Sequence, residues 1–140
     1  MALCFVLLFV TPGVAADKVR LATGEWPPYI SKGLQHYGVA SHIVTDAFAV
    51  EGLEVEITFL PWRRAYTQAE AGDFDGTFGW SRESGREQDF YYSDPIFEDS
   101  MVFFHLKRTP FEWETMDDLK GLRIGGTFEY YYGDAFRAAE

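Results

Sequence analysis

The feature that most constrains the fold is an alternation of strand-like and helix-like segments before residue 81. Three segments rich in apolar and β-branched residues predict strands, and two helical patterns lie between them. In chain order these are a strand over 18–23, a helix over 38–52, a strand over 53–60, a helix over 61–72 and a strand over 74–80. This order predicts an α/β fold with parallel strands, right-handed crossovers and a sheet covered on both faces.

The helical pattern is clearest in the first helix, where apolar residues recur at intervals of three and four. These residues are Ala40, Ile43, Val44, Ala47 and Phe48. Further elements are expected later in the chain: a strand over 100–107, a short helix over 114–119, a strand over 122–126 and a helix beginning around Tyr132. No strand follows that helix, so we expect the chain to be truncated within a second layer.

Residues 1–16 predict a secretory signal peptide, and therefore a periplasmic protein. They carry no charge, and their apolar run over 2–10 is too short to span a bilayer as a helix. A Pro-Gly pair interrupts the run, and the small residues at 14–16 suit signal peptidase. Because no basic residue follows Met1, either the true start codon lies upstream, which is the interpretation we favour, or the segment is not an export signal.

Composition limits the partners and cofactors. The chain has 22 acidic and 12 basic residues, all after residue 16, which disfavours nucleic acid and anionic lipid as partners. The single cysteine is Cys4, so the mature chain has no thiol chemistry. His36, His42 and His105 are scattered, and no phosphate-binding glycine loop is present. We therefore expect neither a metal nor a cofactor.

Aromatic residues follow each of the first three predicted strands. They are Trp26 and Tyr29 after the first, Trp62 after the second and Trp80 after the third. Ligands of open α/β sheets bind beyond the carboxyl ends of the strands, where a rigid ring stacks on a ligand at little entropic cost. We interpret these residues as the lining of a binding crevice, with core filling as an equal alternative for Trp80.

The loop after the third strand adds Ser81 and two arginines. A guanidinium presents a planar fork that matches a carboxylate with two parallel hydrogen bonds. Such a fork at Arg86, with the Ser81 hydroxyl beside it, would suit a small anion or zwitterion. On the residues alone, an ordinary ion pair of low energetic value is the slightly favoured interpretation. Its candidate partners are Glu83, Asp89 and Asp94.

Four stretches, in their order and spacing, resemble the extracellular solute-binding proteins of family 3, the periplasmic receptors of polar amino-acid ABC transporters. They are VRLATGEWPPY (19–29), AGDFDG (71–76), GREQDFYYSDP (85–95) and MDDLKGLRIGGTFEYYYG (116–133). The most specific parts are an arginine followed seven residues on by Ser-Asp-Pro, and Asp-Leu-Lys-Gly before a predicted strand.

The resemblance implies a periplasmic-binding-protein-like fold, in which two α/β lobes close on a ligand about a hinge. Lobe 1 would span residues 17–97 and be nearly complete. Residues 98–140 would contain the hinge crossing and a partial lobe 2.

The resemblance also assigns roles. Arg86 would clamp the ligand carboxylate, with Ser81 or its neighbour as the hydroxyl donor beside it. Trp26 and Trp62 would sandwich the ligand side chain. In lobe 2 the contacts would come from Thr127 and Phe128.

Two residues depart from the family pattern. Glu83 stands three residues before the clamp arginine, where the family usually has threonine. The acidic residue often found in the first loop is replaced by Gly24, with Glu25 beside it. The lobe 2 aspartate that pairs the ligand amine in the family would lie beyond Glu140.

The implied function is that of a monomeric, non-enzymatic receptor. It would carry a small polar or amino-acid-like solute to an ABC transporter permease. One alternative is a dehydratase of the cyclohexadienyl or prephenate type, with Arg86 on the substrate carboxylate and Glu25 or Glu83 as proton donor. Another is a sensor domain of a membrane histidine kinase or of a lytic transglycosylase.

Overall fold

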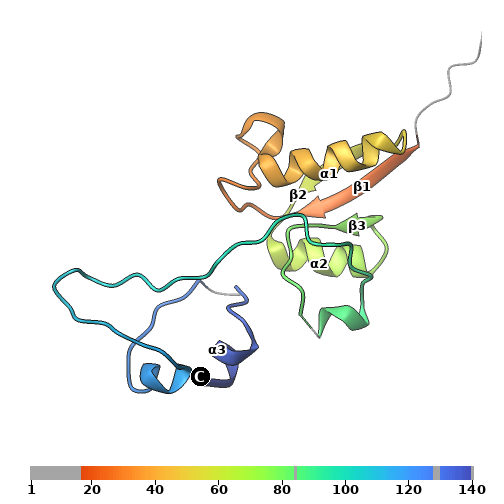
Figure 1. Cartoon of the computed structure of the whole chain (residues 1–140). Coiled ribbons are helices and arrows are strands. Elements are labelled where there is room, and N and C mark those ends of the chain that lie inside the picture. Colours follow the sequence, from red (N-terminus) through yellow and green to blue (C-terminus); the bar gives the residue numbers. More distant parts are fainter. Residues whose placement is uncertain (1–16, 84, 128–129, 140) are drawn as a thin grey trace, which may run out of the picture. The chain divides into compact units, whose positions relative to one another are not determined.

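The computed structural model describes residues 17–83, 85–127 and 130–139. The chain divides into two compact units, of which unit 1 ends at Ile96 and unit 2 begins at Phe97 (Figure 1). The lobe boundary expected from the sequence lies one residue further along the chain. The expected signal peptide lies outside the described residues.

Unit 1 contains a three-stranded parallel sheet in the order β2-β1-β3. Its strands and α-helices are β1 (Lys18–Thr23), α1 (Val39–Val50), β2 (Glu54–Phe59), α2 (Trp62–Glu70) and β3 (Gly76–Thr77). Since β2 and β3 flank β1, right-handed crossovers place the two helices on opposite sides of the sheet, as Figure 1 shows. Unit 1 is therefore mixed α/β with a small parallel sheet, which is the class that the alternating pattern predicts.

The core of unit 1 lies between the sheet and its two helices. Its buried residues include Leu21, Ala22, Thr23, Ile30, Ala40, Ser41, Val44, Ala65, Ala69 and Phe78. The buried stripe of α1 is narrower than predicted, because Ile43 is 41% exposed and Ala47 is exposed as well. In the described ranges, no helix combines the length and the apolar run that crossing a bilayer requires.

Strand β3 is shorter than the predicted strand over 74–80, because side chains replace part of its backbone ladder. The backbone N–H of Arg20 donates to the Asp75 carboxylate at 2.7 Å, where a strand partner would offer a carbonyl. Beyond the ladder, the Thr23 hydroxyl donates to the carbonyl of Phe78 at 3.0 Å. The segment therefore follows β1 along most of its predicted length, although only Gly76–Thr77 pairs as a strand.

Unit 2 contains the short 3-10 helix η3 (Met116–Leu119) and helix α3 (Asp134–Ala139). The strands predicted over 100–107 and 122–126 are wrong, since neither range forms a strand. A strand requires a neighbour for its backbone groups, and the described sheet pairs only the three strands of unit 1. Except for the half-buried Phe103, the apolar residues of the ranges 100–107 and 122–126 are exposed, as in Phe104 at 95%. The ring of Phe103 instead contacts the rings of Phe111, Trp113 and Phe136.

Candidate functional site

Trp62 joins two of the loops at the carboxyl ends of the strands. It is the first residue of α2, and Pro61 before it, with a φ of −52°, sets the entry into the helix. The indole N–H donates to the carbonyl of Glu25 at 3.2 Å. The indole also lies against the backbone of Gly24 and Gly79, where a Cβ would meet the ring. The loops after β1 and β3 therefore pack on one side chain.

Three further rings extend from Trp62 and form, with it, the aromatic cluster of Trp62, Tyr66, Trp80 and Phe90. Trp80 makes edge contacts with Trp62 at 4.9 Å and with Tyr66 at 5.5 Å between ring centroids. Tyr66 in turn contacts Phe90 at 5.1 Å. All four residues are partly exposed. The four rings therefore pack against one another while part of each residue stays accessible to solvent.

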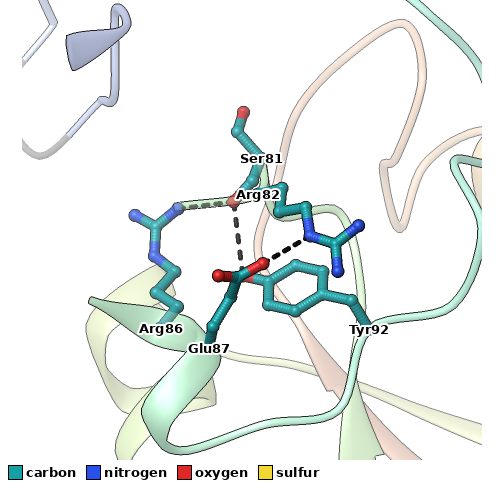
Figure 2. Close-up of polar contacts among 5 residues, drawn as sticks. All are labelled: Ser81, Arg82, Arg86, Glu87 and Tyr92. Carbon is teal, nitrogen blue, oxygen red and sulfur yellow. Dashed lines mark hydrogen bonds and ion pairs between the residues drawn. The ribbon is translucent and has the colours of Figure 1, made fainter. Parts of the chain in front are cut away.

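Arg86 lies on this cluster and is held by three contacts. Its Nη1 donates to the backbone carbonyl of Ser81 at 2.9 Å (Figure 2). Its Nη2 lies 3.2 Å from Oε2 of Glu83, and its Cζ lies 5.0 Å from the centroid of the Trp80 ring. The side chains of Arg86 and Glu83 are only 17% and 12% exposed. Of the three carboxylates considered as partners of Arg86, the structure pairs it with Glu83.

The carbonyl of Ser81 is the common acceptor of this loop. It accepts from Arg86 and, at 3.3 Å, from the hydroxyl of Tyr92. Figure 2 shows the Ser81 hydroxyl directed away from both donors. In this geometry Ser81 acts on Arg86 through its main chain.

A second ion pair in the same loop is of a different kind. Nε of Arg82 lies 2.6 Å from Oε1 of Glu87, and both groups face solvent, at 68% and 45% exposure (Figure 2). Solvent screening makes such a pair worth little. The two arginines of the loop are therefore not equivalent, since only Arg86 is largely removed from water.

Two tyrosines of the site have raised pKa values. Burial and the hydrogen bond that Tyr66 donates to Asp89, at 2.6 Å, raise the pKa of Tyr66 to about 12. Burial also raises the pKa of Tyr92, although the nearby charge of Arg86 lowers it in part. Both hydroxyls are therefore protonated donors at neutral pH.

The loop after β1 brings Trp26 and Tyr29 together. Their ring centroids are 4.7 Å apart, and a backbone bridge pairs Trp26 with Ile30. Glu25 is exposed, and its carboxylate accepts from the backbone N–H of Lys32 at 3.2 Å. The carbonyl of Glu25, by contrast, contacts the aromatic cluster through Trp62.

The candidates from the last part of the chain belong to unit 2. Thr127 is exposed, and its backbone N–H donates to the hydroxyl of Tyr132. Phe128 lies outside the described residues. Among the described residues, the contacts named above that bring predicted site residues together lie within unit 1.

Sequence reasoning missed Tyr66 and Tyr92 as members of the site. The signal for Tyr66 was present, because it lies four residues after Trp62 and so on the same face of α2. Tyr92 lies in an irregular segment, where no periodicity indicates the direction of a side chain.

The site offers the guanidinium fork of Arg86, aromatic faces and the carboxylate of Glu83 beside the fork. Among the residues that the structure describes, no group of three histidine, cysteine or acidic side chains could hold a metal ion. No family model, curated protein or solved structure matches this chain. A guanidinium fork beside aromatic faces is chemically suited to binding a charged, partly apolar small molecule.

Proposed function

We propose that the protein is the solute-binding receptor of a membrane transporter, and that it binds an amino acid or a related carboxylate. The observation that supports this most is the position of Arg86, over the Trp80 ring and beside Glu83 at the carboxyl ends of the parallel strands. That edge is where open α/β sheets bind their ligands.

Arg86 is suited to a carboxylate because its guanidinium is oriented before a ligand arrives. The carbonyl of Ser81 and the ring of Trp80 hold the fork, so little side-chain freedom remains to be lost on binding. Low exposure also weakens solvent screening, which strengthens a charged hydrogen bond. A lysine would supply the charge without the two parallel donors.

The aromatic cluster is suited to the remainder of the ligand. Trp80 lies against the guanidinium and Trp62 lies against Trp80, and both residues are partly exposed. A ligand held by Arg86 would therefore meet rigid apolar surface. Such surface favours a small solute with an apolar part and one charged end.

The biological setting in this proposal follows the family that the sequence resembles. The protein would be exported by its first sixteen residues, act in the periplasm as a monomer without catalysing a reaction, and deliver its solute to an ABC permease. Closure of two lobes about a hinge would complete the site.

Isothermal titration of the full-length protein against the standard amino acids tests this function. We expect exothermic binding of at least one of them and no chemical change in the recovered ligand. Absence of heat across the whole panel would contradict the proposal. Consumption of a prephenate-like acid, with loss of that activity in Glu83→Gln, would instead indicate a dehydratase.

A further inference from the structure

We propose that Glu83 determines the charge type of the ligand, by binding its ammonium group while Arg86 binds its carboxylate. This inference deepens the proposed function and rests on it. It makes Glu83 a specificity residue and selects α-amino acids over plain carboxylates and plain amines.

The Arg86–Glu83 pair is largely shielded from water. The two side chains are 17% and 12% exposed, and Nη2 and Oε2 are 3.2 Å apart. In the same loop, the Arg82–Glu87 pair is 68% and 45% exposed. Only the first pair is sheltered enough for a neighbouring charge to affect a ligand strongly.

A ligand with a single charge fits this pair poorly. A plain carboxylate would gain Arg86 but would also lie beside the negative charge of Glu83, which repels it. A plain amine would gain Glu83 but would lie beside the guanidinium. In both cases a like charge within a few ångströms opposes binding in a poorly solvated site.

A zwitterion meets both charges with their opposites. An α-amino acid carries its ammonium and carboxylate on one carbon, so its two charges are adjacent, as those of Arg86 and Glu83 are. An amino acid bound between the two side chains would replace the Arg86–Glu83 contact by two contacts to the ligand. Its carboxylate would face Arg86 and its ammonium would face Glu83. Neither protein charge would lose an opposite partner, which limits the desolvation cost.

Glu83 is carried by the same turn of the chain as Arg86. It lies three residues before Arg86, where η2 (Arg86–Gln88) begins, and the backbone N–H of Arg86 donates to the carbonyl of Glu83 at 2.9 Å. The shared turn therefore fixes the spacing of the two side chains. Aspartate at this position would keep the charge on a shorter arm.

The test is titration of the full-length protein with three probes. These are the amino acid that binds most tightly, the same molecule without its amino group, and the same molecule without its carboxylate. For Glu83→Gln we expect about tenfold weaker binding of the amino acid and tighter binding of the des-amino carboxylate, because one charged hydrogen bond and one repulsion are removed. Glu87→Gln, which makes the same change in the exposed pair, should leave all three affinities unchanged.

Glu83→Asp keeps the negative charge, so it distinguishes an effect of the charge on selectivity from an effect of the substitution on folding. It should retain the preference for the amino acid, and circular dichroism should match that of the wild-type protein. Unchanged selectivity in Glu83→Gln, with normal binding of the amino acid, would overturn this inference and leave the receptor function standing. Equal loss of selectivity in Glu83→Asp and Glu83→Gln would overturn it too. Failure of the wild-type protein to bind any amino acid would overturn both proposals.

Discussion

The indole of Trp62 lies directly against the backbone of Gly24, in the space that a Cβ on that residue would occupy. Gly24 follows the last residue of β1, and Trp62 is the first residue of α2. The close approach brings the two loops together beneath the aromatic cluster.

Gly24→Ala should therefore disturb both stability and the site. The added methyl group forces the indole or the β1 strand end to move, and overpacking of this kind costs about 1–3 kcal/mol of unfolding free energy. Urea denaturation and tryptophan fluorescence measure the two effects. Gly33→Ala is the matched control, because a Cβ at Gly33 has no atom within 4 Å and should change stability by less than about 0.5 kcal/mol. Equal stability of the two variants would contradict this packing.

Asp89→Asn should lower the pKa of Tyr66 from about 12 toward its ordinary value of 10.0. The change removes the carboxylate that accepts the Tyr66 hydroxyl and whose charge opposes the phenolate. A folded-state pKa above 10.0 also means that the stabilisation from this tyrosine is fully present below pH 10.0 and is lost as the pH rises toward about 12. Ultraviolet titration of the phenolate measures the shift. An unchanged titration curve in Asp89→Asn would show that the hydrogen bond is not made.

Asp75→Asn should remove a stabilisation that is present at neutral pH and lost in acid. The backbone N–H and the side chain of Arg20 both donate to Asp75, which lowers the pKa of its carboxyl below 3.8. A lowered folded-state pKa means that the contribution is present above pH 3.8 and is lost as the pH falls through the folded-state value. The difference in unfolding free energy between wild type and Asp75→Asn should therefore shrink in acid.

The matched control for Asp75 is Asp73→Asn, which changes an exposed carboxylate in the same loop. Chemical denaturation over the acid range, compared with neutral pH, is the measurement. A difference between wild type and Asp75→Asn that stays constant with pH would contradict the contact with Arg20.

The first half of the fold was predictable because local pattern and tertiary packing agree there. The strand that apolar alternation predicts over 18–23 has the same bounds as β1, and the helical pattern over 61–72 contains α2. The strand predicted over 100–107 is wrong because local pattern and tertiary packing disagree there. Its apolar composition indicates burial, but a strand also needs backbone partners, and Phe104 is almost fully exposed.

The site was predictable in its residue types and less so in its contacts. Trp62 and Trp80 could be identified as candidates because each is a rigid aromatic residue directly after a predicted strand. The sequence left open whether Arg86 pairs with Glu83, because an ion pair depends on side-chain directions that spacing alone does not fix. For Ser81 the predicted residue contacts Arg86 through a different atom, since the carbonyl and not the hydroxyl accepts the hydrogen bond.

The most direct measurement of the central claim is the affinity of three arginine variants for the amino acid that the full-length protein binds best. Arg86→Ala should weaken binding at least about 100-fold, because two charged hydrogen bonds together contribute about 3 kcal/mol. Arg86→Lys should recover only part of this loss, since it restores the charge without the planar fork. Arg82→Ala, which removes the exposed arginine of the same loop, should bind like wild type. Wild-type affinity in Arg86→Ala would contradict the account.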